Sequence, residues 1–304
     1  MNKPIYLSVV LCTYNEERYI MDSVLSILNQ TYPYFELIIV NDGSTDKTKE
    51  ILETLNDKRI RIINKPNTGL PNSLNVGISQ AKYNWIARMD GDDIALPNRF
   101  ADQIKLIEQG YDIIGGQFLE IDGDGNLKSS ICSRKPVCAL KCKLFVFLGW
   151  NPLAHPTAII KKDILEKMGG YDENFKASQD LELWSRLSHC CKIINSNEVV
   201  LKYRKHANNI SNSKKDKQIF LGFMAFVKYA LKLRKPLNDS QFNMLSNDAF
   251  VMKCIYENRK KFDKTHSSVG LFRKLCFFDY YVWRLWTFIC LRIRSSKYHK
   301  FMMI

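Results

Sequence analysis

The 304-residue sequence lacks the motifs of several common protein classes. It has no run of about 18 uncharged apolar residues, so no membrane-spanning helix is expected. The apolar run at residues 5–12 is too short, and too polar at its end, for a secretory signal peptide. Neither the G-x-G-x-x-G pattern of dinucleotide-binding Rossmann domains nor the G-x-x-x-x-G-K-[ST] loop of P-loop proteins is present. Both of those nucleotide-binding classes are therefore excluded.

Metal sites built on cysteine or on a calcium loop are also missing. Cys132, Cys138 and Cys142 show no C-x-x-C spacing and no matching histidine pair, and the total of nine cysteines is odd. Reduced thiols in a cytoplasmic protein are the expected state. Residues 122–126 begin like a calcium loop, but the glycine and glutamate that such a loop needs later are absent. We expect a hairpin turn there.

Acidic residues are scarce in the last third of the chain. Residues 201–304 hold 22 Lys and Arg against 6 Asp and Glu, whereas residues 1–200 hold 23 and 25. The first part is typical of an ordinary soluble domain, and the second predicts a basic surface that meets an anionic partner. No nucleic-acid recognition motif accompanies this charge, so nucleic acid is not expected as a partner.

Aromatic residues are interleaved with cations at residues 269–293. Such a segment suits an amphipathic helix that lies on an anionic membrane surface without crossing it. The alternative is an ordinary helix whose aromatic side chains pack against the rest of the protein. We divide the chain into residues 1–213 and a basic, aromatic-rich helical region at residues 214–304, and we expect the latter to hold the protein at the inner face of a membrane.

Apolar, β-rich segments alternate with segments of helical periodicity over the first 115 residues. Strands are predicted at residues 7–12, 35–40, 59–63, 84–89 and 112–115, and helices at residues 15–28, 47–55, 71–81 and 97–108. This alternation predicts an α/β fold with a mostly parallel sheet and helices on both faces. In such sheets ligands bind beyond the carboxyl ends of the strands.

Polar clusters follow three of the predicted strands, at residues 13–16, 41–44 and 90–93. The third cluster contains three carboxylates, Asp90, Asp92 and Asp93, which repel one another and lose hydration beside a buried strand. A hard divalent cation would offset that cost, and Mg²⁺ or Mn²⁺ held by few carboxylates takes further ligands from phosphates and water. The alternative is an acidic turn that caps the following helix.

These clusters, in this order and spacing, resemble the family 2 glycosyltransferases of the GT-A fold. The resemblance continues through Asn67 and Asn75, through the segments at residues 169–173 and 178–184, and through residues 203–206 with Ser211. It covers about residues 6–212. The family implies a Rossmann-like nucleotide-diphospho-sugar transferase domain and an inverting transfer of a sugar from a UDP-sugar donor to a hydroxyl of a glycan or lipid-linked acceptor, in polysaccharide or cell-surface glycan biosynthesis.

The resemblance also implies a role for individual residues. Asp180 matches the catalytic base that takes the proton of the acceptor hydroxyl. Asp92 matches a direct ligand of Mg²⁺ or Mn²⁺, with Asp90 and His206 as further candidates. The implied contacts to the nucleotide-sugar are Thr13, Tyr14, Asn15, Glu16, Asp42, Asn67, Asn75, Asp90, Gly91, Arg204 and Ser211.

Structural alternatives exist for several of these residues. Asp42 could simply form a turn, and Asn15 or Asp180 could cap a helix. Arg204 could belong to a solvated basic face. Two other functions also remain open at this point: a nucleotidyltransferase of related fold, which should carry a glycine-rich phosphate loop after the first strand, and a non-catalytic scaffold, which would not need these carboxylates.

Overall fold

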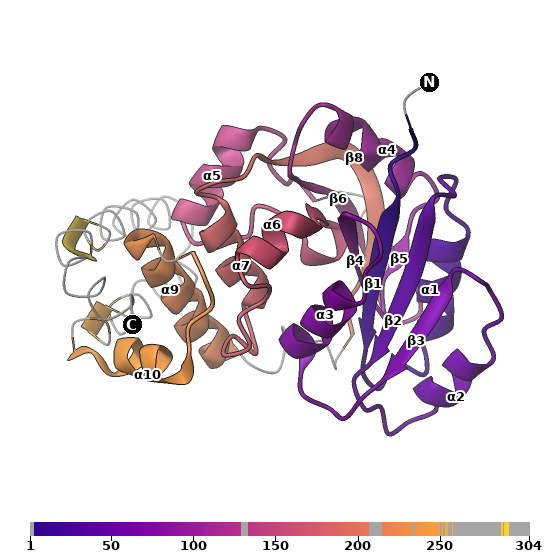
Figure 1. Cartoon of the computed structure of the whole chain (residues 1–304), viewed down its shortest axis with the longest axis horizontal. Helices are drawn as coiled ribbons and strands as arrows, with labels where there is room; N and C mark the ends of the chain where they lie inside the picture. Colours follow the sequence, from indigo (N-terminus) through magenta and orange to yellow (C-terminus); the bar gives the residue numbers. More distant parts are fainter. Residues whose placement is uncertain are drawn as a thin grey trace.

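The computed structural model describes residues 3–128, 133–206, 215–232 and 234–249, with residues 251, 253, 254, 257, 287 and 289–291. Within them, helices flank an eight-stranded mixed sheet with the order β3-β2-β1-β4-β7-β6-β8-β5 (Figure 1). The strands are β1 (Leu7–Thr13), β2 (Phe35–Asn41), β3 (Ile60–Asn64), β4 (Trp85–Asp90), β5 (Ile94–Ala95), β6 (Ile113–Ile121), β7 (Ile159–Lys161) and β8 (Ile193–Arg204).

Strands β1 to β4 form the parallel half of the sheet. Thr13 pairs with Asn41, and Cys12 pairs with Asp90. Strands β1, β2 and β4 therefore end at the same edge of the sheet, and the polar residues that follow them lie close together there. The predicted parallel βα arrangement of residues 7–89 is confirmed.

Helices cover both faces of the sheet, as predicted. The helices are α1 (Ile20–Leu28), α2 (Thr48–Glu53), α3 (Leu70–Ser79), α4 (Arg99–Glu108), α5 (Ala139–Phe147), α6 (Lys162–Lys167), α7 (Gln179–Leu187), α9 (Lys215–Leu231) and α10 (Asp239–Asn247), with a 3₁₀ turn η1 (His155–Thr157). Val9 and Leu11 pack with α1, α2 and α4, whereas Val10 and Cys12 pack with α3, α5, α6 and α7. This alternation follows from the two-residue period of a strand.

The second half of the sheet differs from the prediction. The strand predicted at residues 112–115 is the start of the longer β6, and it does not lie next to β4. Strand β7 lies between them and runs antiparallel to both. With three residues, β7 is too short to give a periodic signal in the sequence. The predicted hairpin turn at residues 122–126 is present, with Ile121 bridging antiparallel to Leu127.

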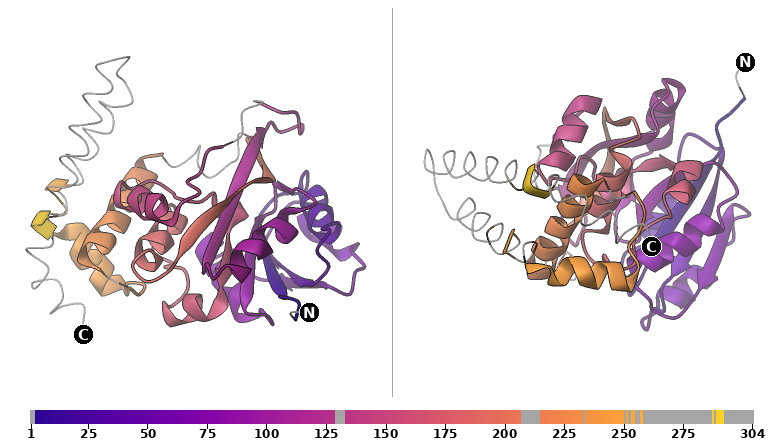
Figure 2. Two further views of the ribbon diagram at one scale, coloured as in Figure 1. Left: turned by 90° about the horizontal axis from the view of Figure 1, so that it is seen from above. Right: turned by 60° about the vertical axis from the view of Figure 1, so that its left-hand side comes forward.

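Helices α9 and α10 lie beyond α7 as seen from β1–β3 (Figure 2). Leu181 of α7 shares an apolar cluster with Leu221 and Phe223 of α9, so α9 is packed directly on the helix that carries Asp180. The boundary at residue 213 stays a prediction. Among the described residues, no helix combines the length and the apolar character that crossing a bilayer requires. Ser211 and most of residues 266–304 lie outside the described residues.

Candidate active site

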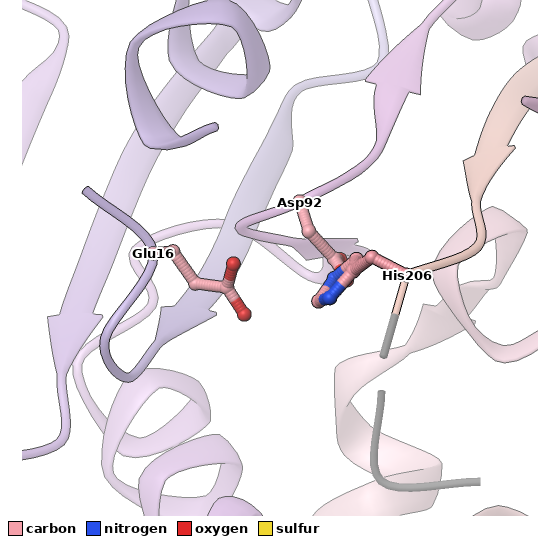
Figure 3. A group of neighbouring side chains, drawn as sticks. All are labelled: Glu16, Asp92 and His206. Atoms are coloured by element: carbon pink, nitrogen blue, oxygen red, sulfur yellow. The ribbon is translucent and has the colours of Figure 1, made fainter. Parts of the chain in front are cut away.

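Three side chains from different loops meet at the carboxyl edge of the sheet. Glu16 follows β1, Asp92 lies in the turn between β4 and β5, and His206 follows β8. Figure 3 shows the Glu16 carboxylate pointing toward Asp92 and His206. One ligand atom from each lies within 4.8 Å of the others, and His206 Nε2 is 2.9 Å from Asp92 Oδ2. Asp90, Asp92 and Asp93 form a second group within the same limit.

Close packing fixes the turn that carries these aspartates. Ser23 Oγ donates a hydrogen bond of 2.7 Å to the Asp90 carbonyl, and the buried Arg88 pairs with the Asp90 carboxylate. A Cβ atom on Gly91 would lie 2.9 Å from Thr13 Oγ1. The glycine is therefore required, because the turn after β4 approaches the end of β1 too closely for a side chain.

Burial, and after it mutual repulsion, raises the pKa of these carboxyl groups. Burial raises the pKa of Glu16 to about 9, with repulsion from Asp92 and Asp90 as further causes. Burial also raises the pKa of Asp90 to about 6; Arg88 opposes the shift and Asp92 adds to it. These shifts arise because several carboxyl groups share a poorly solvated place. Carboxylate oxygens with one imidazole nitrogen form a ligand set that Mn²⁺ or Mg²⁺ accepts. The residues therefore fit the predicted metal.

Asp93 links this turn to β8 through a hydrogen bond, a role that its sequence did not indicate. It is buried, its Oδ1 accepts a hydrogen bond of 2.8 Å from the Arg204 backbone N–H, and its Oδ2 is buried without a partner. Burial, with Asp92 and Asp90 nearby, raises its pKa well above the usual range. Its position as the third acid of the cluster was the only sequence signal for it.

Arg204 joins three loops. Its Nε donates to the Asp92 carbonyl at 2.8 Å, its Nη1 donates to the Gly123 carbonyl at 3.1 Å, and its guanidinium carbon lies 4.6 Å from the centre of the Tyr19 ring. The alternative of a solvated basic face is wrong, because Arg204 is buried. Its side chain orients the turn that holds Asp92, and a contact with pyrophosphate stays a prediction.

Asp42 organises the loop that contains Asn67. Its carboxylate accepts hydrogen bonds from the backbone N–H groups of Thr68 (3.0 Å) and Gly69 (2.9 Å) and pairs with Lys65. Burial alone would raise its pKa, but these partners lower it, so Asp42 is ionised. The side chain that bonds within this turn is Asn41, whose Oδ1 accepts from the Ser44 N–H at 3.1 Å.

Asn15 is not a helix cap, because α1 begins only at Ile20. Its backbone is left-handed, with φ of 56°, and its Oδ1 accepts a hydrogen bond of 2.8 Å from the Thr45 N–H. It therefore ties the loop after β1 to the loop after β2. The predicted helix start at residue 15 is wrong because this loop needs a conformation that a helix cannot contain.

Asp180 lies in the first turn of α7. Its Oδ1 accepts from the Leu181 N–H at 2.8 Å, and its Oδ2 accepts from Asn151 Nδ2 at 2.8 Å. The capping alternative is wrong, since α7 begins at Gln179 and Ser178 is its capping residue. Burial raises the pKa of Asp180, and Arg88 and Lys135 oppose the shift. Asp180 in turn contributes to the raised pKa of Asp90.

Comparison with known proteins now identifies the family. The model of glycosyl transferase family 2 matches residues 8–169, and that of a glycosyltransferase-like family 2 matches residues 133–236. The chain belongs to glycosyltransferase family 2. The second match extends past residue 213 into α9, which agrees with the packing of that helix on α7.

Relatives of this glycosyltransferase occur in bacteria and archaea. It is 35% identical over 219 residues to an uncharacterised glycosyltransferase of Haemophilus influenzae, covering 68% of this chain and 67% of the relative. It is 37% identical over 227 residues to one of Methanocaldococcus jannaschii, covering 71% and 77%. It is 33% identical over 214 residues to the O-antigen biosynthesis glycosyltransferase WbnJ of Escherichia coli, covering 68% and 82%.

Solved structures show that the glycosyltransferase has the predicted GT-A fold. S. aureus TarS 1–349 superposes with a TM-score of 0.61 at 17% identity, covering 96% of this chain and 81% of that one. The mannosyltransferase PcManGT of Pyrobaculum calidifontis, solved with GDP-Man and Mn²⁺, gives a TM-score of 0.55 at 16% identity, covering 95% and 85%.

Two other residues of the glycosyltransferase have contacts that the sequence did not indicate. Asn75 on α3 accepts from the Tyr171 N–H at 2.8 Å and donates to the Tyr171 carbonyl at 2.9 Å, so its amide holds the segment before α7. Its predicted contact with the donor stays a prediction. His155 of η1 is buried, with its Nε2 2.8 Å from the Tyr171 hydroxyl. Burial keeps its pKa well below the usual range.

Proposed function

We propose that the enzyme transfers a sugar, with inversion, from a UDP-sugar to a hydroxyl of a glycan or lipid-linked acceptor, with Mg²⁺ or Mn²⁺ as cofactor. The observation that carries the proposal is the group formed by Glu16, Asp92 and His206, whose ligand atoms lie within 4.8 Å of one another at the carboxyl edge of the sheet. Burial raises the pKa of both Asp90 and Asp180, Arg88 opposes both shifts, and Asp180 adds to the shift of Asp90. This transfer needs a base and a cation site that act on the same sugar.

Each group has a definite task in this proposal. Asp92, His206 and Glu16 would hold the cation, with Asp90 beside them. A bound divalent cation stabilises the negative charge of a departing diphosphate. Asp180 receives the proton of the acceptor hydroxyl, and its raised pKa brings it closer to the pH at which a general base is most effective.

Similar proteins support the donor and the pathway class. TarS was solved with UDP-GlcNAc and with UDP, at TM-scores of 0.60 and 0.58. WbnJ, by its name, acts in O-antigen biosynthesis. Membership in family 2 removes the nucleotidyltransferase alternative. Location at the inner face of a membrane through residues 214–304 remains part of the proposal, supported by the excess of cations there.

A donor screen tests this function. The protein is incubated with UDP-glucose, UDP-galactose, UDP-GlcNAc, UDP-GalNAc or GDP-mannose, in Mn²⁺, Mg²⁺ or EDTA, and a panel of octyl glycosides serves as acceptors. Nucleotide release and glycosylated product are both measured. We expect one UDP-sugar to give metal-dependent product with an inverted anomeric centre. A preference for GDP-mannose would refute the UDP assignment, and retention at the anomeric carbon would refute the inverting mechanism.

A further inference from the structure

Two residues that were not among the predicted site residues are linked to Asp180. Asn151 contacts Asp180 directly, and Lys135 contacts Asn151. They come from the loops on either side of α5. Asn151 Nδ2 donates to Asp180 Oδ2 at 2.8 Å, and Lys135 Nζ donates to the Asn151 carbonyl at 3.1 Å. The two loops are thereby joined to each other and to the predicted base.

The other end of the Asn151 amide has no partner. Asn151 Oδ1 is buried and accepts no hydrogen bond. The orientation of the amide is determined by Asp180, because an ionised carboxylate only accepts hydrogen bonds and must therefore face the NH₂ group. Buried polar atoms in folded proteins are nearly always paired, so an unpaired oxygen beside a base indicates a place where a ligand donates.

Asp180 itself has acceptor positions left for a further hydrogen-bond donor. Each of its oxygens accepts one hydrogen bond from the protein, from Leu181 and from Asn151, and each carboxylate oxygen has two acceptor positions. The titratable groups that face it are Arg88 on β4, Lys135, Asp90 and Tyr171. None of these interactions occupies Asn151 Oδ1.

We propose that Asn151 is both a positioning residue for Asp180 and part of the acceptor subsite. Its Nδ2 holds the base, and its Oδ1 accepts a hydrogen bond from a second hydroxyl of the acceptor sugar. The attacking hydroxyl gives its proton to Asp180 as its oxygen bonds to the anomeric carbon, and the bond from that carbon to the diphosphate breaks, with the electron pair leaving on UDP. This inference rests on the proposed function.

The test compares Asn151→Ala and Asn151→Asp with a control, Asn84→Ala. Asn84 lies before β4 at the far end of the sheet, and its Oδ1 accepts from the Asp163 N–H at 3.3 Å. For each variant, kcat and KM are measured for the best UDP-sugar and the best octyl glycoside of the screen, between pH 5 and 9. UDP binding and the melting temperature are measured as well.

Asn151→Ala should lower kcat/KM for the octyl glycoside about 10- to 100-fold, because a hydrogen bond to a buried polar group is lost. The KM for the UDP-sugar should not change. A donor to an ionised carboxylate lowers its pKa, so removing it should move the acid limb of the pH–rate profile to higher pH. Asn151→Asp keeps an acceptor oxygen but places a second carboxylate beside Asp180. It should move the acid limb further and raise the acceptor KM less.

Several outcomes would overturn the inference. If Asn151→Ala matches Asn84→Ala in acceptor KM and in its acid limb, Asn151 has neither role. If both Asn151 variants lose UDP binding or stability instead, the residue is structural. If the wild-type enzyme releases no nucleotide with any donor, the proposed function fails and the inference fails with it. If the wild-type enzyme transfers sugar and both Asn151 variants transfer it equally well, the proposed function stands and the inference alone fails.

Discussion

Lys228 should be essential for stability, although it lies outside every predicted motif. It projects from α9 into a fully buried cluster, where it pairs with Asp172 (2.8 Å) and with Glu182 of α7. Arg186 completes the cluster through two hydrogen bonds to Glu182, of 2.6 and 2.7 Å. Two cations thus balance two carboxylates without solvent.

Lys228→Met removes one cation and leaves a similar volume. One buried carboxylate then lacks compensation, which costs about 3–5 kcal/mol of unfolding free energy. At about 2 °C per kcal/mol for a chain of this size, the melting temperature should fall by roughly 6–10 °C. Lys49→Met is the matched control, because Lys49 makes only an exposed ion pair of 3.8 Å with Glu53. That variant should lie within about 0.5 kcal/mol of wild type.

The double variant Asp172→Asn/Lys228→Met separates charge from packing. It removes one charge of each sign, so its destabilisation should be about 1–3 kcal/mol smaller than the sum of the single variants. Urea unfolding followed by circular dichroism is measured for the wild type, both single variants, the double variant and the Lys49→Met control. A Lys228→Met variant within 1 kcal/mol of wild type, or strictly additive effects, would refute the account of the buried network.

The pH dependence gives a second check on Lys228. Burial alone would raise the pKa of Asp172, but Lys228 and the N–H groups of Leu237 and Asn174 lower it overall. Such a carboxyl stabilises the fold above its unfolded pKa of about 3.9 and loses that contribution as the pH falls through its folded pKa. Without Lys228 the pKa of Asp172 rises, and protonation relieves the buried charge. The stability gap between wild type and variant should therefore narrow from pH 7 toward pH 4.

Two further predictions concern the ligands. UDP should raise the melting temperature by its full amount only when Mn²⁺ or Mg²⁺ is present. EDTA or His206→Ala should remove most of that increase. Equal stabilisation by UDP in excess EDTA would argue against a metal-bridged diphosphate. The full chain should bind acidic phosphatidylserine vesicles at low salt and less at high salt, while truncation before His266 should abolish vesicle binding and retain UDP binding. Unfolding of the truncated chain would show instead that its aromatics belong to the core.

The sequence was most informative where local pattern and topology agree. The strands at residues 7–12, 35–40 and 84–89 are rich in apolar residues, as strands buried on both faces are, and a parallel register brings their carboxyl ends to one edge. The meeting of Glu16 with Asp92 follows from that rule. The family resemblance implied Asp92 and His206 as candidate ligands of one cation, and that assignment stays a prediction.

The remaining features depend on contacts between distant segments, which have no local pattern. Asp93 and Arg204 are 111 positions apart, yet one hydrogen bond joins them. Asn151 is 29 positions from Asp180, in a loop without periodicity. The role of Lys228 could not be predicted because a lysine in a helix usually faces water, and only the tertiary structure buries it.

The most direct test of the central claim is transfer by Asp180→Asn. The amide preserves the shape of the carboxylate but cannot take the acceptor proton at neutral pH. With the donor and acceptor found in the screen, and with saturating Mn²⁺, the variant should bind UDP as wild type does and transfer sugar about 10²- to 10⁴-fold more slowly. Transfer at the wild-type rate would contradict the account, because Asp180 would then not be the base.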